Sequence, residues 1–303
     1  MYKIIIAFIV AILILAIGMR QCNDDDTEVE SGVYPEQVDI SKDITESKIE
    51  KKNDNNKNEP ETEKESLPSE DYKPGLETPR LTIDLPEQIL IRKSYSVSYN
   101  NKTKCPNWVA WHLTSEHTNG PISRKGIPYI ADNEIKGPRQ EVEDWDSIKF
   151  IRIWDHGHMC PAGDNKWDRV AMEETFLLSN FCPQNQQLNG GDWRILEEKC
   201  RRWANKYKDI YIACGPIYND SLNVRKLKNK IWIPDAFYKV VLCLNKTPKA
   251  IGFICPNVGE GHSLDHYAVS VDRVEEITGI DFFYILNDTI ENNIEAIFNF
   301  NEW

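Results

Sequence analysis

A short segment of the chain gathers side chains suited to proton transfer. Asp155, His156, His158 and Cys160 lie within six residues, and Gly157 between the histidines permits an unusual backbone angle. Imidazole changes its protonation near neutral pH, which suits it to general base catalysis. A structural histidine is the simpler alternative for each ring, and zinc binding through the His-x-His-x-Cys spacing is another.

A second group of polar residues follows 31 residues after His158. Asn189 precedes a strongly helical pattern, where a helix N-cap is its simplest role. Glu197 and Arg201 are four residues apart, so they share a helix face, and an exposed ion pair is their simplest role. These simple interpretations treat each residue alone.

Taken together, the residues form a set that suits metal-assisted hydrolysis of phosphodiesters. A hard cation such as Mg²⁺ needs few protein oxygens and keeps most of its waters, so one amide oxygen from Asn189 suffices. Glu197 would orient a water on the cation, and Arg201 would hold a phosphate oxygen through its planar fork. His158 would supply the base.

The elements that must position this set follow from hydrophobic periodicity. An apolar stripe predicts a helix over residues 193–207, and further helices are predicted at 172–178 and 288–300. Residues 115–148 are polar and loop-like. Alternating or apolar runs predict strands at residues 94–100, 107–114, 150–154, 210–214, 231–233, 237–244 and 250–255. This order predicts an α+β domain with a mixed or antiparallel sheet and flanking helices.

Charge is distributed unevenly along the 303 residues. Residues 21–80 contain 18 Asp and Glu against 8 Lys and Arg, whereas residues 81–303 contain 30 against 26. The acidic segment has few large apolar side chains, which predicts a disordered linker, with an acidic interaction tail as the alternative. The folded domain is expected over residues 81–303. Its mild net charge neither indicates nor excludes a nucleic-acid partner.

The first 20 residues are typical of a targeting segment. Lys3 precedes an apolar run over residues 4–17, which is short for a bilayer span of roughly 20 residues but sufficient for a signal sequence. The approach to Cys22 through Met19, Arg20 and Gln21 is unlike that of a lipidated cysteine. We therefore expect a signal anchor, with the remainder exported. A cleaved signal peptide, giving a secreted protein, and a buried helix are the alternatives.

The chain contains eight cysteines, and export permits disulfides. Seven of them lie in residues 81–303, so at least one stays unpaired or pairs outside that segment. No Cys-x-x-Cys spacing occurs, which argues against a structural zinc site.

The polar motifs also resemble those of a known family, the DNA/RNA non-specific endonucleases, or ββα-metal nucleases. The matching residues are Asp155-His156-Gly157-His158 with Pro161, Asn180-Phe181-Cys182-Pro183-Gln184, and then Asn189, Trp193, Glu197 and Arg201. The resemblance extends from about residue 81 to the C-terminus. It includes Gly215-Pro216 and residues 274–283.

The resemblance implies a ββα-metal active-site motif with defined roles. His158 would be the general base and Asn189 the ligand of Mg²⁺, with Mn²⁺ or another divalent cation as the alternative. Glu197 and Arg201 would support waters on the cation and the phosphate. Asp155 and Asn180 would be structural supports. The substrates would be DNA and RNA, cut without sequence preference to leave 5′ phosphates, because contacts would reach phosphate and sugar rather than bases.

One residue departs from the family pattern. The family has Arg or Lys between the Asp and the Gly, where this chain has His156, which we expect to serve phosphate binding. A catalytically weak or inactive nucleic-acid-binding surface protein is therefore the alternative function. Other hydrolase classes lack support, because neither Gly-x-Ser-x-Gly nor His-Glu-x-x-His occurs.

Replacement of His156 tests the importance of this departure. An Arg is always charged, whereas a His is mostly neutral above about pH 6.5. We expect His156→Arg to raise cleavage activity more at about pH 8 than at about pH 6, measured as initial rates. Equal effects at both pH values would contradict a phosphate-binding role for this position.

Overall fold

The computed structural model describes residues 75–146, 153–219 and 223–303. The expected signal anchor at residues 1–20 and residues 21–74 of the expected linker lie outside the described residues. So do residues 150–152 of one expected strand. Residues 75–80, the end of that expected linker, are described and belong to the folded part, because Leu76 is buried and a strand begins at Arg80. Within the described ranges, no helix is long and apolar enough to cross a membrane.

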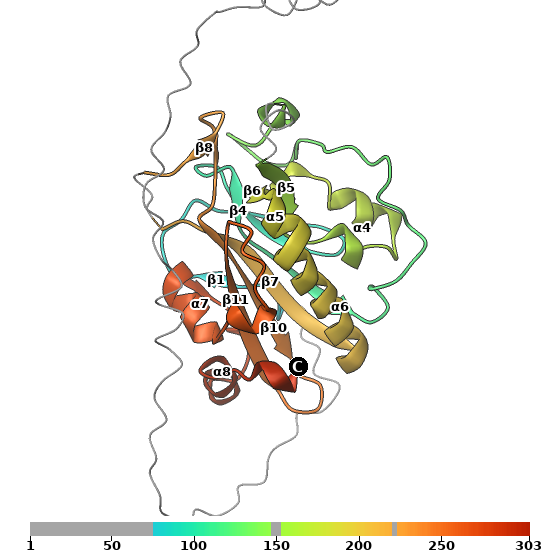
Figure 1. Cartoon of the computed structure of the whole chain (residues 1–303), viewed down its shortest axis with the longest axis vertical. Coiled ribbons are helices and arrows are strands. Elements are labelled where there is room, and N and C mark those ends of the chain that lie inside the picture. Colours follow the sequence, from blue (N-terminus) through green and yellow to red (C-terminus); the bar gives the residue numbers. More distant parts are fainter. Residues whose placement is uncertain (1–74, 147–152, 220–222) are drawn as a thin grey trace, which may run out of the picture. The chain divides into compact units, whose positions relative to one another are not determined.

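A seven-stranded sheet forms the centre of the fold (Figure 1). All neighbouring strands in it are antiparallel. In spatial order the strands are β12 (Ala268–Val269), β11 (Lys249–Pro256), β10 (Ala236–Cys243), β7 (Asp209–Ile217), β4 (Cys105–Thr114), β3 (Ser96–Asn100) and β2 (Gln88–Ile91). The expected α+β class is confirmed, and the main sheet is antiparallel.

Smaller elements surround this sheet. Three two-stranded sheets pair β1 (Arg80–Leu81) with β13 (Ile280–Asp281), β5 (Trp154–His158) with β6 (Phe181–Asn185), and β8 (Lys226–Leu227) with β9 (Ile231–Trp232). The α-helices are α4 (Arg169–Glu174), α5 (Gln186–Leu188), α6 (Arg194–Tyr207), α7 (Val271–Thr278) and α8 (Asp288–Glu295). Short helical turns are η1 (Val142–Trp145), η2 (Ala162–Asp164), η3 (Leu178–Asn180), η4 (Asn189–Trp193), η5 (Leu264–His266) and η6 (Phe300–Glu302).

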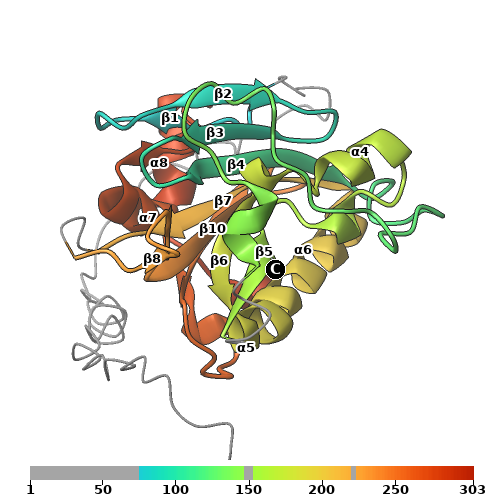
Figure 2. The ribbon, with the colours of Figure 1, turned by 90° about the horizontal axis from the view of Figure 1, so that it is seen from above.

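Helices cover both faces of the sheet (Figure 2). On β11, the ring of Phe253 packs on Trp203 of α6, with 6.2 Å between ring centroids. The preceding residue, Gly252, faces α7, because a Cβ there would lie 2.7 Å from Val274 Cγ2. Successive side chains of a strand point to opposite faces, so α6 and α7 lie on opposite sides. This double cover buries every residue of β10.

The bounds of two expected helices differ from the observed ones. The helix expected at residues 172–178 is α4, which begins at Arg169 because the Asp168 side chain caps it by accepting from Ala171 N at 2.9 Å. The helix expected at residues 288–300 ends at Glu295. The chain then leaves the helix, and Phe298 and Phe300 pack against the core.

The histidine segment is itself a strand rather than the end of one. We expected a strand at residues 150–154 that leads into Asp155, but β5 continues through His158 and pairs antiparallel with β6. Gly157 does not have a positive φ, so our expectation of an unusual backbone angle was wrong. Glycine is needed at this position because there is no room for a side chain: a Cβ at Gly157 would lie 2.5 Å from Cβ of the buried Gln184.

This crowding predicts the effect of a single methyl group. We expect Gly157→Ala to lower the free energy of unfolding by about 1–3 kcal/mol, because the β5–β6 hairpin must shift to relieve the overlap. Urea denaturation measures this change. The control is Gly190→Ala, where a Cβ meets no atom within 4 Å, and it should change stability by less than about 0.5 kcal/mol. Equal stabilities of the two variants would show that the hairpin has room at position 157.

Candidate active site

One continuous segment forms a ββα unit that carries all the expected site residues. β5 and β6 form a hairpin, in which Asp155 lies opposite Gln184 and His158 opposite Phe181. β6 is followed without interruption by α5, η4 and α6, which runs along the sheet (Figure 1). The hairpin therefore contributes the aspartate and histidine, and the helix contributes the asparagine, glutamate and arginine.

Asn189 is held by the hairpin. Its Nδ2 donates to Oδ2 of Asp155 at 3.0 Å, so the side-chain oxygen Oδ1 remains as the donor atom for a cation. The simplest interpretation of Asn189, a helix N-cap, is wrong, because its side chain does not cap the helix. That role belongs to Asn185, whose side chain accepts from Gln187 N at 2.8 Å. Asn189 instead begins η4, in which the backbone leaves helical geometry at Gly191 and forms a kink between α5 and α6.

His158 lies at the end of β5 with 8% of its surface exposed. Its ring packs edge-on against Phe181 and Phe176, at centroid distances of 4.4 and 5.3 Å. Burial, together with the charges of Arg124 and His156, lowers the pKa of His158 to about 3. The ring is therefore neutral at physiological pH. Its Nε2 is buried and has no hydrogen-bond partner among the described residues. A neutral imidazole nitrogen of this kind can accept a proton.

Asn180 fixes the backbone just after His158. It is fully buried, its Oδ1 accepts from Cys160 N at 2.9 Å, and its Nδ2 donates to Cys160 O at 2.9 Å and to Thr175 O at 3.0 Å. The amide therefore satisfies both backbone groups of one residue in the segment that follows the base. These contacts fit the supporting role expected for Asn180.

Arg201 pairs with a residue that the sequence did not single out. Its Nη1 donates to Oδ1 of Asp164 at 2.8 Å, and Oδ2 of Asp164 accepts from Trp111 Nε1 at 3.1 Å. In the described part of the chain, Arg201 thus pairs with Asp164 and not with Glu197. Because Asp164 lies 37 residues before Arg201, no local spacing indicated this pair. The hydrogen bond to Asp164 uses Nη1 of the guanidinium, and the group has further N–H donors that a ligand can accept from.

Glu197 is half-buried and surrounded by charged groups. Its pKa is raised to about 7, because burial and the charge of Asp164 raise it more than Lys239, Arg201 and Arg124 lower it. Lys239 is the largest of the lowering influences. The charge on Glu197 therefore depends on this lysine.

Lys239 is a fully buried lysine in β10, an interior strand of the sheet. Its Nζ has no hydrogen-bond partner among the described residues, and it lies 4.4 Å from the ring centroid of Trp193 and 5.3 Å from that of Trp111. Burial lowers the pKa of Lys239, but two buried cysteines, Glu197 and Asp164 outweigh this effect and raise it. Contact with two indole rings partly replaces the lost hydration of the ammonium group.

Arg124 is a second cationic residue of the site that no sequence motif indicated. It lies in the segment that we described only as polar and loop-like, and its side chain is exposed. Its guanidinium lies 5.5 Å from the ring centroid of Phe176, which also contacts His158. Its charge lowers the pKa of both His158 and Glu197. An exposed guanidinium close to both groups is a candidate for binding phosphate.

His156 lies between two aromatic rings. Its imidazole stacks on Tyr129 with 4.1 Å between centroids and on Trp145 with 4.0 Å, at interplanar angles of 5° and 20°. These contacts hold the ring flat between its neighbours. The expected role of His156 in phosphate binding stays a prediction.

Neither disulfide bonds nor zinc binding by His156, His158 and Cys160 is supported by the described residues. All seven cysteines there are free and buried, so the disulfides that export would permit are not formed among them. No group of three metal-binding side chains there includes His156, His158 or Cys160. The described residues contain two such groups elsewhere, Glu260–His262–His266 and Asp272–Glu275–Glu295.

Comparisons with known proteins match this architecture. Residues 75–289 match the family described as DNA/RNA non-specific endonuclease. The mitochondrial nuclease EXOG of Danio rerio is 34% identical over 207 residues, which cover 63% of this chain and 59% of that protein. A nuclease of Nostoc sp. is 30% identical over 233 residues, covering 73% of this chain and 82% of that protein.

A solved structure also resembles this fold. It is described as the crystal structure of the EndoG/EndoGI complex, with a TM-score of 0.59 and 27% sequence identity over 66% of this chain and 87% of that one. The expected α+β fold with its ββα motif is thereby confirmed. The chain spans only 59% of the EXOG protein of Danio rerio and 57% of that of Homo sapiens.

The buried lysine leads to a prediction about pH. An ionised Glu197 is present above its pKa and is lost as the pH falls through that value. Because Lys239 lowers this pKa, Lys239→Met should raise it above about 7. We expect cleavage by this variant to fall several-fold at about pH 7 and to recover towards about pH 9, measured as rate against pH at one Mg²⁺ concentration.

The matched control for this prediction is Lys249→Met. Lys249 also contacts aromatic rings, Tyr207 and Trp303, but none of the site residues has its pKa shifted by it. It should leave the pH profile unchanged. Parallel pH profiles for Lys239→Met and the unaltered chain would remove Lys239 from this role.

Proposed function

Because the chain belongs to the DNA/RNA non-specific endonuclease family, we propose that it hydrolyses phosphodiester bonds of DNA and RNA. It does so without sequence preference, depends on a divalent cation and leaves 5′ phosphates. The observation that carries the proposal is the hydrogen bond from Asn189 to Asp155, which uses the amide nitrogen and so leaves the amide oxygen available next to the strand that bears the neutral His158.

The residues present fit a hard divalent cation. Asn189 offers an oxygen as the ligand, and the half-buried Glu197 in the following helix α6 would orient a water on the cation. Few protein oxygens and several retained waters are typical of Mg²⁺ sites, so Mg²⁺ is the preferred ion and Mn²⁺ the alternative. When bound, the cation supplies positive charge that stabilises the transition state and the departing 3′ oxygen.

His158 acts as the base for the attacking water. Burial and the charge of Arg124 keep the imidazole neutral, so one ring nitrogen carries a lone pair, and Nε2 has no hydrogen-bond partner among the described residues. An incoming phosphate opposes the charge of Arg124 and thereby favours proton transfer to the ring. The water oxygen then bonds to phosphorus as the bond to the 3′ oxygen breaks, which leaves the phosphate on the 5′ side.

Two guanidinium groups hold the phosphate. Arg201 is fixed by Asp164 and keeps unused donors, and Arg124 is exposed near His158 and Glu197. Ionised Glu197 accepts hydrogen bonds from water in the site and so orients it. Contacts of this type reach phosphate oxygens rather than base edges, which accounts for activity on both DNA and RNA.

Export and anchoring complete the proposal. Lys3 and the apolar run over residues 4–17 support a signal anchor at residues 1–20, and the acidic composition supports a linker at residues 21–74. The nuclease domain, which begins at about residue 75 rather than at residue 81, then acts outside the cytoplasm, attached to the membrane, or secreted if the anchor is cleaved.

Plasmid and RNA cleavage by the full chain tests the catalytic proposal. We expect Mg²⁺-dependent cleavage of both substrates and its loss in EDTA. His158→Ala should lower the rate by about 10²–10⁴-fold, because the base is removed. Asn189→Ala should raise the Mg²⁺ concentration needed for half-maximal rate. The control is His262→Ala, because this histidine is exposed on another loop. Its rate should equal that of the unaltered chain.

The same experiment decides the alternative function. The replacement of the family Arg or Lys by His156, which lies between two aromatic rings, is the observation that favours a non-catalytic nucleic-acid-binding protein. Binding of DNA without cleavage in Mg²⁺ or Mn²⁺ would establish that alternative. Cleavage that survives in His158→Ala would instead show that another group acts as the base.

A further inference from the structure

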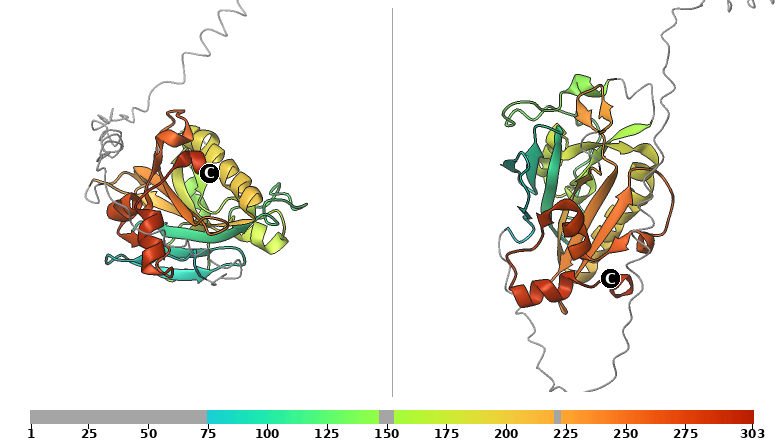
Figure 3. Two further views of the ribbon diagram at one scale, coloured as in Figure 1. Left: turned by 90° about the horizontal axis from the view of Figure 1, so that it is seen from below. Right: turned by 90° about the vertical axis from the view of Figure 1, so that its left-hand side faces the viewer.

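A group of carboxylates lies between α7 and α8, which are neighbours on the face of the sheet opposite to α6 (Figure 1, Figure 3). Asp272 and Glu275 come from α7, and Glu295 comes from the last turn of α8. Each residue offers one carboxylate oxygen, and these oxygens all lie within 4.8 Å of one another. No part of the proposed nuclease mechanism uses them.

Glu295 is the member of this group whose carboxylate is buried without a hydrogen-bond or ion-pair partner among the described residues. Only 3% of its surface is exposed, and its Oε1 is buried with no hydrogen-bond partner among the described residues. A buried carboxylate without a partner is costly, because its hydration is lost and nothing replaces it. Either a proton or a cation must therefore neutralise this side chain.

The surroundings of Glu295 increase this demand. Four further carboxylates, Glu275, Glu291, Asp272 and Asp281, act on Glu295 through their negative charges. These neighbours bring negative charge from α7, α8 and β13 to one place. Cationic compensation is limited, because Arg80 is exposed and already pairs with one of these residues, Asp281.

The other two side chains leave the group accessible to an ion. Glu275 is half-buried, and its Oε1 accepts from Phe282 N at 2.7 Å, which fixes its carboxylate. Asp272 is exposed at the start of α7. The group therefore has a buried end, a fixed middle and an open side where water can complete the coordination of a cation.

We propose that Asp272, Glu275 and Glu295 bind a Ca²⁺ ion that joins α8 to α7, separately from the catalytic cation. All three ligands are carboxylates, which suits a hard cation. Ca²⁺ accepts six to eight oxygens in flexible geometry, including bidentate carboxylates, whereas Mg²⁺ demands a near-octahedral arrangement. The ion converts the repulsion among these carboxylates into attraction and stabilises the C-terminal helices on the sheet.

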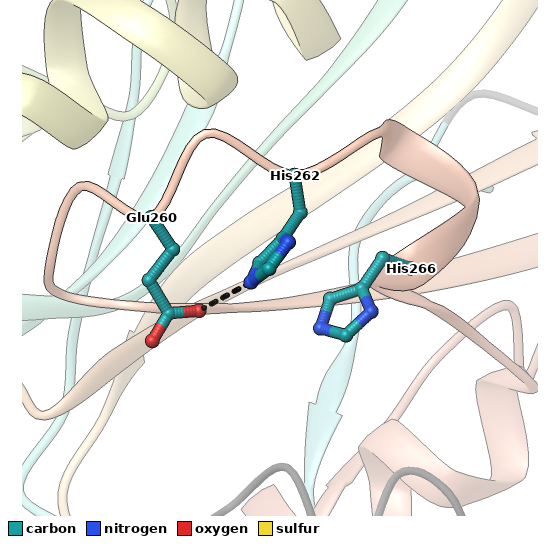
Figure 4. A group of neighbouring side chains, drawn as sticks. All are labelled: Glu260, His262 and His266. Carbon is teal, nitrogen blue, oxygen red and sulfur yellow. Dashed lines mark ion pairs between the residues drawn. The ribbon is translucent and has the colours of Figure 1, made fainter.

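The second group of metal-binding side chains provides a matched control. Glu260, His262 and His266 come from the loop between β11 and β12, and their polar ends point the same way from that loop (Figure 4). Nε2 of His262 lies 3.3 Å from Oε2 of Glu260, and the two imidazole centroids are 4.1 Å apart. Two imidazoles favour a transition metal such as Zn²⁺ over Ca²⁺. Loss of this group should not affect Ca²⁺ binding.

Calorimetric titration with CaCl₂ and thermal unfolding test the proposal. Both use the full chain carrying Asn189→Ala, so that the catalytic cation does not contribute. We expect one Ca²⁺ per chain and a rise in the melting temperature on Ca²⁺ addition. Adding Glu295→Gln or Glu275→Gln should weaken binding at least tenfold, whereas adding His266→Ala should not change it.

Glu295→Gln also excludes misfolding as an explanation. It removes a buried, unpartnered acid, so we expect a melting temperature without Ca²⁺ at least equal to that of the parent, and no rise when Ca²⁺ is added. Equal Ca²⁺ affinity of Glu295→Gln and its parent would overturn the proposal. So would loss of Ca²⁺ binding in His266→Ala alone, or no Ca²⁺ binding by the parent. None of these results depends on cleavage, so the proposed nuclease function is tested separately.

Discussion

The hydrogen bond between Asn189 and Asp155 joins the two parts of the active site. The positions of the other site residues relative to one another depend on it. Asp155 belongs to the β5–β6 hairpin, and Asn189 belongs to η4 at the beginning of the long helix. The bond fixes the helix relative to the strand that bears His158. It also commits the nitrogen of the amide, so the oxygen is the atom presented to a cation. A shift of one residue in the hairpin register would turn Asp155 to the other face and break this arrangement.

Burial determines the protonation of the groups around this bond. His158 is kept neutral by its apolar surroundings and by nearby positive charge, which is the state required of a base. Glu197 would be mostly protonated by burial alone, and the cations around it oppose that tendency. Arg201 is held by Asp164 and Lys239 by two indole rings, so positive charge is fixed in place before any substrate binds. Such preorganised charge is a large source of catalytic power in enzymes.

The sequence predicted those residues whose roles follow from local spacing and from resemblance to a family. Asp155, His158, Asn189, Glu197 and Arg201 all lie on the ββα unit, and most of the expected strands lie within a few residues of their expected bounds. The short strands β1, β2, β6, β8, β12 and β13 were not expected. Asp164 was missed because its partner lies 37 residues further along the chain. Lys239 was missed because a lysine in a strand normally faces water. Only the cover of β10 on both faces buries it beneath α6, and that cover is a property of the complete fold. The need for glycine at position 157 was explained wrongly by a backbone angle. The true cause is a cross-strand neighbour, which cannot be identified before the register is known.

Charged side chains are buried on both faces of the sheet, but their charge is compensated differently on each face. On the α6 face, buried Lys239 and Asp164 occur together with groups of opposite charge or with aromatic rings, so their charges are compensated within the chain. On the α7 face, Glu295 is buried among further carboxylates, and Arg80, the cation that acts on this acidic region, is exposed. A folded chain does not retain an uncompensated buried charge without cost, because the loss of hydration exceeds what dispersion contacts return. The compensation on the α7 face must therefore come from the solvent, as a proton or as a cation. With three carboxylate oxygens within 4.8 Å of one another, a divalent ion neutralises more of that charge than one proton does.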